Sequence, residues 1–463
     1  MTDFSQLLRP DRGEPAHAVA VIHPSTHEAW LAAQPNHVRA AAEMHRFTAK
    51  DGTHLLVPAA GAGSEPWRVV AAIAEPHSPW ALAKLAASLP PGAYRLVGDT
   101  PPALGWLLAQ YRFTRYRKAE GGEPRVLLTV DPATVDAAVA QAEAVALVRD
   151  LVNTAAADLG PAELEAETVA LASGYGASTA VTRGDTLAAD YPMIHAVGQA
   201  ATPARAPRLI ELEWGDPAHP RVAIVGKGVC FDTGGLDIKP ASAMRLMKKD
   251  MGGAAHALAL ARLVMGARLP VRLHLLIPAV ENAVSAASFR PGDVLRTRKG
   301  LTVENTNTDA EGRLILGDAL TKAGEGKPEL ILDFATLTGA ARVALGPDLP
   351  ATFSNDDALM ADLVAAGQEV DDPLWPMPLW DGYDEMLKSD VADLVNAPEG
   401  GMAGAITAAL FLRRFAPEGV AWAHLDTFAW RQAAKPGRPK GGDALGLRAA
   451  WALLRKRYAP QPR

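Results

Sequence analysis

The sequence predicts an α/β protein with a small N-terminal α/β domain and a larger C-terminal domain, in which helices flank both faces of a mixed sheet. Three observations favour this fold class. The chain has 463 residues, enough for two domains with sizeable cores. Short apolar runs alternate with helical patterns along most of it. A long alanine-rich helical pattern near residue 150 separates two such stretches, so we expect domains over residues 1–150 and 151–463.

The N-terminal domain shows its alternating pattern before residue 130. Apolar runs and helical spacing predict five elements there, strands over residues 17–22, 69–73 and 94–97 and helices over 78–89 and 103–111. Asp131 followed by Pro132 is typical of a helix start, because the acid caps the first turn and proline needs no N–H donor there. The alanine-rich pattern continues toward Asn153, so the domain is expected to end in this linker helix.

The C-terminal domain repeats the alternation on a larger scale. Strands are predicted over residues 209–213, 222–225, 272–277, 330–334 and 420–425, with helices that start near Ser242, Ala358, Ala403 and Leu445. The helix from Ser242 has an apolar stripe at three- and four-residue spacing, made by Met244, Met247, Met251, Ala254 and Leu258. Met244 and Met251 are interpreted as core. Asp250 falls within the stripe, so its buried carboxylate needs a partner.

Composition and charge exclude several classes of protein. A net charge of −6 disfavours a general nucleic-acid binder, which needs a basic face. The single cysteine, Cys230, excludes an intrachain disulfide framework and a cysteine zinc site, and favours a reducing compartment. The first residues lack the apolar core of an export signal, and no uncharged apolar run reaches the ~20 residues of a membrane helix. We therefore expect a cytoplasmic protein with no membrane partner.

One octapeptide, residues 307–314, concentrates charge in an unusual way. Asp309, Glu311 and Arg313 alternate, which predicts an extended segment with all three side chains on one side. Two carboxylates so close would keep protons unless a concentrated positive charge lay between them. An isolated pattern of this kind is also typical of a polar loop in which the arginine pairs with its neighbours.

A second cluster lies upstream, where Lys227 and Asp232 follow the predicted strand at residues 222–225. The carboxyl end of such a strand is where open α/β sheets bind ligands. With Asp250, Asp309 and Glu311, the two clusters supply four carboxylates and one amine. Hard oxygen ligands suit divalent cations, and two cations that share bridging carboxylates are the usual way to hold four acids in one cavity. The lysine could join only as a neutral amine, which a nearby dication permits.

These motifs resemble those of the leucyl aminopeptidases, two-metal cytosolic exopeptidases. The family octapeptide N-T-D-A-E-G-R-L is unchanged at residues 307–314. A second family motif matches residues 225–235, with Thr233 in place of serine, and a third matches residues 247–255. The family's Lys-Pro pair is Lys239-Pro240. The likeness covers roughly the C-terminal two-thirds of the chain.

The resemblance implies an enzyme that hydrolyses the N-terminal residue from peptides with two divalent metal ions, Mn or Zn, with Mg or Co as further possibilities. One ion would be held by Lys227, Asp232, Asp250 and Glu311, and the other by Asp232, Asp309 and Glu311. A water between the two ions would be the nucleophile. The family is hexameric, so the resemblance also implies a homo-hexamer.

Two further residues have catalytic roles by resemblance. Lys239 would donate to the developing oxyanion, and Arg313 would hold a bicarbonate ion that carries the proton to the leaving amine. The alternative that Arg313 only neutralises Asp309 and Glu311 stays open.

The pocket for the first residue of the peptide matches the family at Met247, Thr336 and Gly339. It departs at Phe428, where the family has a small residue. The preferred N-terminal residue, the native metals and the role of the N-terminal domain are therefore left open by the sequence.

Two other functions compete with this interpretation. A different two-metal hydrolase, such as a phosphatase, would need extra cations to clamp a phosphate. A regulatory or binding protein with a vestigial site would have lost ligands, whereas all four acids and both lysines are present. The sequence therefore favours the aminopeptidase.

Overall fold

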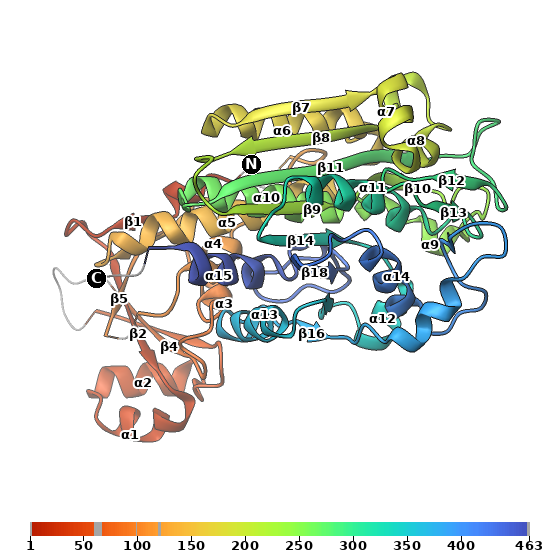
Figure 1. Ribbon diagram of the computed structural model, residues 1–463. Coiled ribbons are helices and arrows are strands. Elements are labelled where there is room, and N and C mark those ends of the chain that lie inside the picture. The colour runs from red at the N-terminus through yellow and green to blue at the C-terminus, as the bar shows by residue number, and fades with distance from the viewer. Residues whose placement is uncertain (1, 60–66, 99, 119–121, 461–463) are drawn as a thin grey trace. The chain divides into compact units, whose positions relative to one another are not determined.

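The computed structural model in Figure 1 describes residues 2–59, 67–98, 100–118 and 122–460. The chain divides into two compact units. The first comprises Met1–Ala146 together with Ala433–Lys440, and the second comprises Leu147–Gln432 together with Gly441–Arg463. A short segment from far downstream therefore belongs to the N-terminal unit, which no sequence pattern predicted.

The first unit contains a six-stranded mixed sheet, as the α/β prediction requires. Its strands, in spatial order, are β1 (Leu8–Pro10), β6 (Arg125–Thr129), β5 (Gly92–Val97), β2 (His17–Ile22), β4 (Arg68–Ala72) and β3 (His54–Val57). Only β3 is antiparallel to its neighbour. The three predicted strands are confirmed as β2, β4 and β5.

The helices of this unit are short: α1 (His27–Ala32), α2 (Asn36–Met44), α3 (Ala83–Ser88) and α4 (Leu104–Leu108). The predicted helices over residues 78–89 and 103–111 were too long. Turns precede α3, where Ala81 N donates to Ser78 O over 3.0 Å, so the helical spacing includes residues outside the helix.

Helix α5 (Ala133–Asn153) begins where the sequence predicted, because Asp131 Oδ1 accepts a hydrogen bond from Ala133 N at 3.1 Å. The division between the two units falls within this helix. Neither α5 nor any other helix in the described part of the chain has the length and apolarity to span a bilayer.

The second unit is built on a nine-stranded mixed sheet, whose strands can be followed from β7 to β16 in Figure 1. In spatial order they are β7 (Ser178–Arg183), β8 (Arg208–Trp214), β11 (Arg272–Asn282), β9 (Arg221–Gly226), β14 (Leu330–Ala335), β18 (Ala421–Asp426), β15 (Ala351–Ser354) and β16 (Trp375–Pro376), with β10 (Gly228–Asp232) paired to β11. The central strands β11, β9, β14 and β18 are parallel. All five predicted strands are confirmed.

Two groups of helices cover this sheet. One group is α6 (Pro161–Tyr175), α10 (Gly252–Gly266), α15 (Leu447–Tyr458) and α13 (Asp357–Glu369), which contact one another in that order. The other is α8 (Pro192–Gly198), α11 (Glu311–Glu325), α14 (Gly404–Arg413) and α12 (Gly339–Leu345), again a chain of contacts. The flanked mixed sheet is therefore confirmed, with a core between α11 and the sheet that includes Leu314, Leu316 and Ile331.

The single helix predicted from Ser242 is wrong. The chain forms α9 (Ala241–Met244), a 3-10 turn over Met247–Lys249 and only then α10. Tertiary hydrogen bonds stabilise the break: Ala254 N donates to Lys227 O at 2.8 Å, and Thr336 Oγ1 donates to Asp250 O at 3.0 Å. Met251 is buried as predicted, whereas Met244 is only half-buried.

The predicted extended segment at residues 307–314 is also wrong. Asn307 forms a turn, in which its Oδ1 accepts from Asp309 N at 2.8 Å and its carbonyl accepts from Ala310 N at 3.1 Å. Glu311 is the first residue of α11. Asp309 and Glu311 therefore come together through a turn and a helix start.

Candidate active site

The candidate site lies at the carboxyl ends of the central strands of the second unit. Because β9, β14 and β18 are parallel, the residues that follow them meet at one edge of the sheet. Lys227 follows β9, Thr336 follows β14, and Asp232 ends β10. They line a cavity of about 460 Å³.

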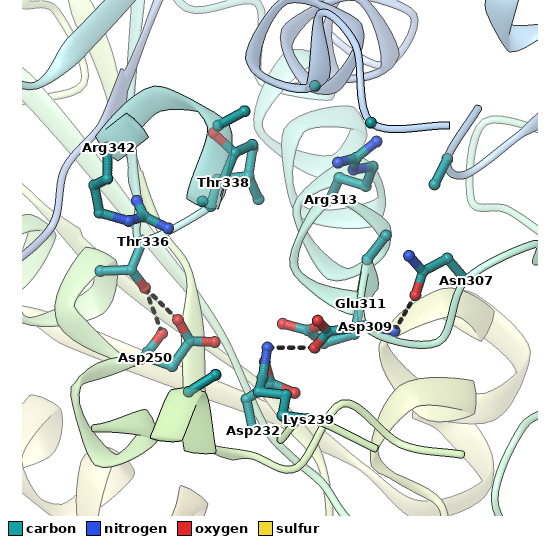
Figure 2. A pocket seen from close by; sticks show the side chains of 18 of the residues that line it. Asp232, Lys239, Asp250, Asn307, Asp309, Glu311, Arg313, Thr336, Thr338 and Arg342 are labelled. Carbon is teal, nitrogen blue, oxygen red and sulfur yellow. Dashed lines mark hydrogen bonds and ion pairs between the residues drawn. The ribbon is translucent and has the colours of Figure 1, made fainter. Parts of the chain in front are cut away.

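Every site residue named from the sequence lines this cavity. They are Lys227, Asp232, Lys239, Met247, Asp250, Asp309, Glu311, Arg313, Thr336, Gly339 and Phe428. Figure 2 shows how the labelled charged residues among them face the same space. Segments separated by some two hundred positions in the sequence thus contribute to one pocket.

Three carboxylates converge most closely. Asp232, Asp309 and Glu311 each offer an oxygen, and these oxygens lie within 4.8 Å of one another. Lys239 Nζ lies 2.8 Å from Asp232 Oδ2 and also pairs with Asp309 (Figure 2). Asn282 Nδ2 orients Asp232 by donating to its Oδ1 at 2.9 Å. The cluster is therefore fixed from several elements before any ion binds.

A second group adjoins the first. Lys227 Nζ lies 2.7 Å from Asp250 Oδ2 and 2.9 Å from Glu311 Oε1, and all three side chains are at most 3% exposed. Gly312 makes this approach possible, because a Cβ there would lie 2.5 Å from Lys227 Cε. Glu311 thus contacts both groups, and the octapeptide needs its glycine for steric reasons.

The carboxylates are not equally charged in this environment. Burial, followed by the charge of Asp232, raises the pKa of Glu311 to about 8 and that of Asp309 to about 6. Burial alone would raise the pKa of Asp250, but Lys227 and Lys249 outweigh it and hold that pKa well below its ordinary value. Without a metal ion, protons therefore relieve the repulsion among these acids.

The pocket fits divalent cations. Glu311 Oε2 is buried and has no hydrogen-bond partner among the residues that the structure describes. A buried carboxylate oxygen without a partner is costly, and a cation would satisfy it. The other donors are hard oxygens from Asp232, Asp250 and Asp309, which is the ligand set that divalent cations prefer.

Arg313 lies in the first turn of α11 with its guanidinium in the pocket. Its Nη1 donates to Asn396 O at 2.7 Å, while its buried Nε has no hydrogen-bond partner within the described part of the chain. Within the described residues it forms no ion pair with Asp309 or Glu311, so direct neutralisation of those acids is not supported. Burial lowers the pKa of Arg313 to about 10, which still leaves it charged at neutral pH and able to hold an anion.

Four further residues of the site were not predicted from the sequence. Asn282 and Asn396 orient Asp232 and Arg313, and Lys249 and Arg342 line the pocket. Lys249 could have been predicted as a site residue, because it is adjacent to Asp250 in the sequence. The other three lie outside the motifs, and only their spatial position reveals them.

Comparison with known proteins gives a consistent result for both units. Residues 146–450 match the catalytic domain of the cytosol aminopeptidase family, and residues 18–129 match the N-terminal domain of M17 aminopeptidases. A probable cytosol aminopeptidase from Syntrophotalea carbinolica is 43% identical over 368 residues, covering 76% of this chain and 73% of that protein.

Solved structures extend the likeness over almost the whole chain. The crystal structure of a cytosol aminopeptidase from Coxiella burnetii is 44% identical, with a TM-score of 0.92 and coverage of 97% of this chain and 99% of that one. The bottromycin maturation enzyme BotP in complex with Mn is 31% identical, with a TM-score of 0.85 and coverage of 96% and 100%. The chain therefore belongs to the cytosol aminopeptidase family, M17, and is a metalloexopeptidase of that family.

Proposed function

We propose that this pocket hydrolyses the first peptide bond of a peptide with two divalent metal ions. The observation that carries the proposal is the convergence of Asp232, Asp309 and Glu311 within 4.8 Å, with a buried Glu311 oxygen that has no partner. Lys227, Asp232, Asp250 and Glu311 would hold one ion. Asp232, Asp309 and Glu311 would hold the other.

When bound, the ions would supply Lewis acidity to the scissile carbonyl and lower the pKa of a water. The protein residues would stabilise developing charge, orient the ligands and bind the substrate side chain. Lys239 offers an ammonium beside Asp232 and Asp309, in position to donate to the oxygen on which charge develops. Thr336 keeps Asp250 oriented through a hydrogen bond of 2.7 Å to its Oδ1. Met247, Thr336, Gly339 and Phe428 would surround the side chain of the first residue.

Metal removal and return test the proposal directly. We expect chelated protein to lose hydrolysis of aminoacyl-p-nitroanilides and to regain it with added Mn, with two ions bound per chain by elemental analysis. Mn is the natural first choice, because BotP has been solved with it. A phosphate ester serves as the control substrate. Hydrolysis of the ester alone, or saturation at fewer than two ions, would contradict the proposal.

Arg313 is proposed to hold a bicarbonate ion that carries the proton to the leaving amine. Support comes from the buried Nε without a partner, beside the pocket. Replacing Arg313 with alanine should reduce kcat by about 10²- to 10⁴-fold, the range typical of proton transfer by a positioned group. Activity of the unmodified protein should rise with bicarbonate in degassed buffer, and that response should disappear in the variant. An unchanged response in the variant would place the anion elsewhere.

Three further features are proposed. We propose a catalytic domain over residues 151–463, preceded by an N-terminal domain over residues 1–150 whose role the site does not require. The assembly is proposed to be a homo-hexamer, which sedimentation would test. A cytoplasmic location is proposed because the relatives are named cytosol aminopeptidases.

A further inference from the structure

The pocket contains a cationic group around Phe428 that the proposed chemistry does not use. Lys249 Nζ lies 5.4 Å from the centroid of the Phe428 ring, and Arg342 Cζ lies 5.3 Å from it. All three side chains line the cavity. We call Lys249, Arg342 and Phe428 the cationic corner.

Lys249 is poorly compensated for a buried charge. Its side chain is 2% exposed, and among the described residues its ion-pair partner is Asp250, at 3.3 Å. Asp250 is already engaged by Lys227 at 2.7 Å and by Thr336 at 2.7 Å. An ammonium group has three donors, so Lys249 can still donate to a ligand. Burying a charge with a weak partner is costly, which favours a ligand of opposite charge.

Arg342 also keeps donors available. Its Nη1 lies 3.3 Å from Asp426 Oδ1, while Asp426 accepts closer bonds from Leu337 N at 3.0 Å and Thr338 Oγ1 at 2.6 Å. The Arg342 side chain is 20% exposed. Figure 2 shows it on the Thr336 and Asp250 side of the pocket, away from Arg313. A guanidinium with one long contact can bind a second carboxylate in bidentate geometry.

The balance of charges in the cavity also favours a ligand with a negative charge. Five cationic side chains line it, Lys227, Lys239, Lys249, Arg313 and Arg342, against the four carboxylates Asp232, Asp250, Asp309 and Glu311. Lys227 and Lys239 are paired with those acids, which leaves the cationic corner to face the substrate. An aliphatic side chain would leave Lys249 and Arg342 with their long contacts to Asp250 and Asp426, whereas an acidic side chain would pair with both cations.

From this geometry we infer that the pocket selects peptides with an acidic N-terminal residue, glutamate or aspartate. This inference rests on the proposed function, because the cationic corner must lie in the pocket for the first side chain. Lys249 and Arg342 contact the substrate carboxylate, and Phe428, which stands where the family has a small residue, shortens the space for long apolar groups.

The test compares matched peptide amides in the Mn-loaded enzyme. We expect kcat/KM for Glu-Ala-Ala-amide to exceed that for Gln-Ala-Ala-amide by about tenfold or more, since the two differ only in charge. Lys249→Met and Arg342→Met should each bring this ratio close to one. Lys248→Met is the matched control, because Lys248 donates to Asn153 O at 2.6 Å outside the cavity lining, and its ratio should stay as in the unmodified protein.

The comparison of the glutamate and glutamine peptides in the unmodified protein tests the preference for an acidic residue even if a variant fails to fold. Equal or faster cleavage of the glutamine peptide, with Leu-Ala-Ala-amide also cleaved, would overturn this inference and leave the proposed function standing. No cleavage of any peptide would overturn both. A substrate could also present its terminal carboxylate to these cations, so Leu-Gly is compared with Leu-Gly-amide. Preference for the free acid without preference for glutamate would overturn the side-chain assignment.

Discussion

Replacing Glu311 with glutamine is expected to reduce kcat/KM by more than about 10³-fold, beyond the ~10- to 100-fold typical of residues that only orient a metal ligand. Glu311 contacts both charged groups of the pocket and would contribute to holding both ions. The glutamine amide carries no negative charge, so it would hold a dication less strongly than the carboxylate does. Elemental analysis should show loss of at least one ion per chain. Glu325→Gln, at the far end of the same helix, is the control and should keep both activity and metal.

Although Glu311→Gln should lower activity, it should stabilise the chelated protein at pH 8. Between pH 4.5 and about 8, an unfolded glutamate has lost its proton whereas folded Glu311 keeps it. The folded state therefore binds more protons, and the stability of the chelated protein falls as the pH rises through this window. Glu311→Gln should flatten that fall and raise the melting temperature at pH 8. A variant less stable than the chelated original at pH 8 would contradict the raised pKa of Glu311.

Replacing Lys239 with methionine is expected to lower kcat by about 10²- to 10³-fold, the loss typical when one donor to a developing oxyanion is removed. Lys239 is proposed to act on the substrate oxygen and not to hold metal, so two ions per chain should still bind and KM should change little. Lys239→Arg keeps a positive charge in a larger group and should recover part of the activity.

Stability measurements separate this role from that of Glu311. Lys239 neutralises Asp232 and Asp309 in the absence of metal, so its loss should destabilise the chelated protein, whereas loss of Glu311 stabilises it. If Lys239→Met instead released one metal ion, or lowered kcat by less than about threefold, Lys239 would be a structural counter-charge and not a catalytic donor.

The pattern of residues in the sequence predicted the fold class and five of the strands of the second sheet. Strands such as β9 and β14 are continuous apolar runs because both of their faces are buried, and burial of that kind is visible in the sequence. Lys227, expected at the carboxyl end of such a strand, follows β9, and Thr336, named from the resemblance, follows β14 at the same edge because parallel strands end together.

Periodicity failed where long-range hydrogen bonds replace local ones. The stripe that includes Met247 and Met251 suggested one helix, but the contacts of Ala254 with Lys227 and of Asp250 with Thr336 interrupt it. The alternation of Asp309 and Glu311 suggested a strand, but the Asn307 turn and the start of α11 override it. Spacing reports only the local backbone, and these partners are distant in the sequence.

The sequence by itself determined which acids and lysines this protein has for metal chemistry. Ligand type depends on side-chain identity, and the sequence motifs contain all of the proposed ligands. Only the tertiary structure decided which other charges join them. Lys249, Phe428 and Arg342 come from three separate segments and meet at one end of the cavity. Their meeting depends on the packing of helices against the sheet, and no local pattern encodes such a contact.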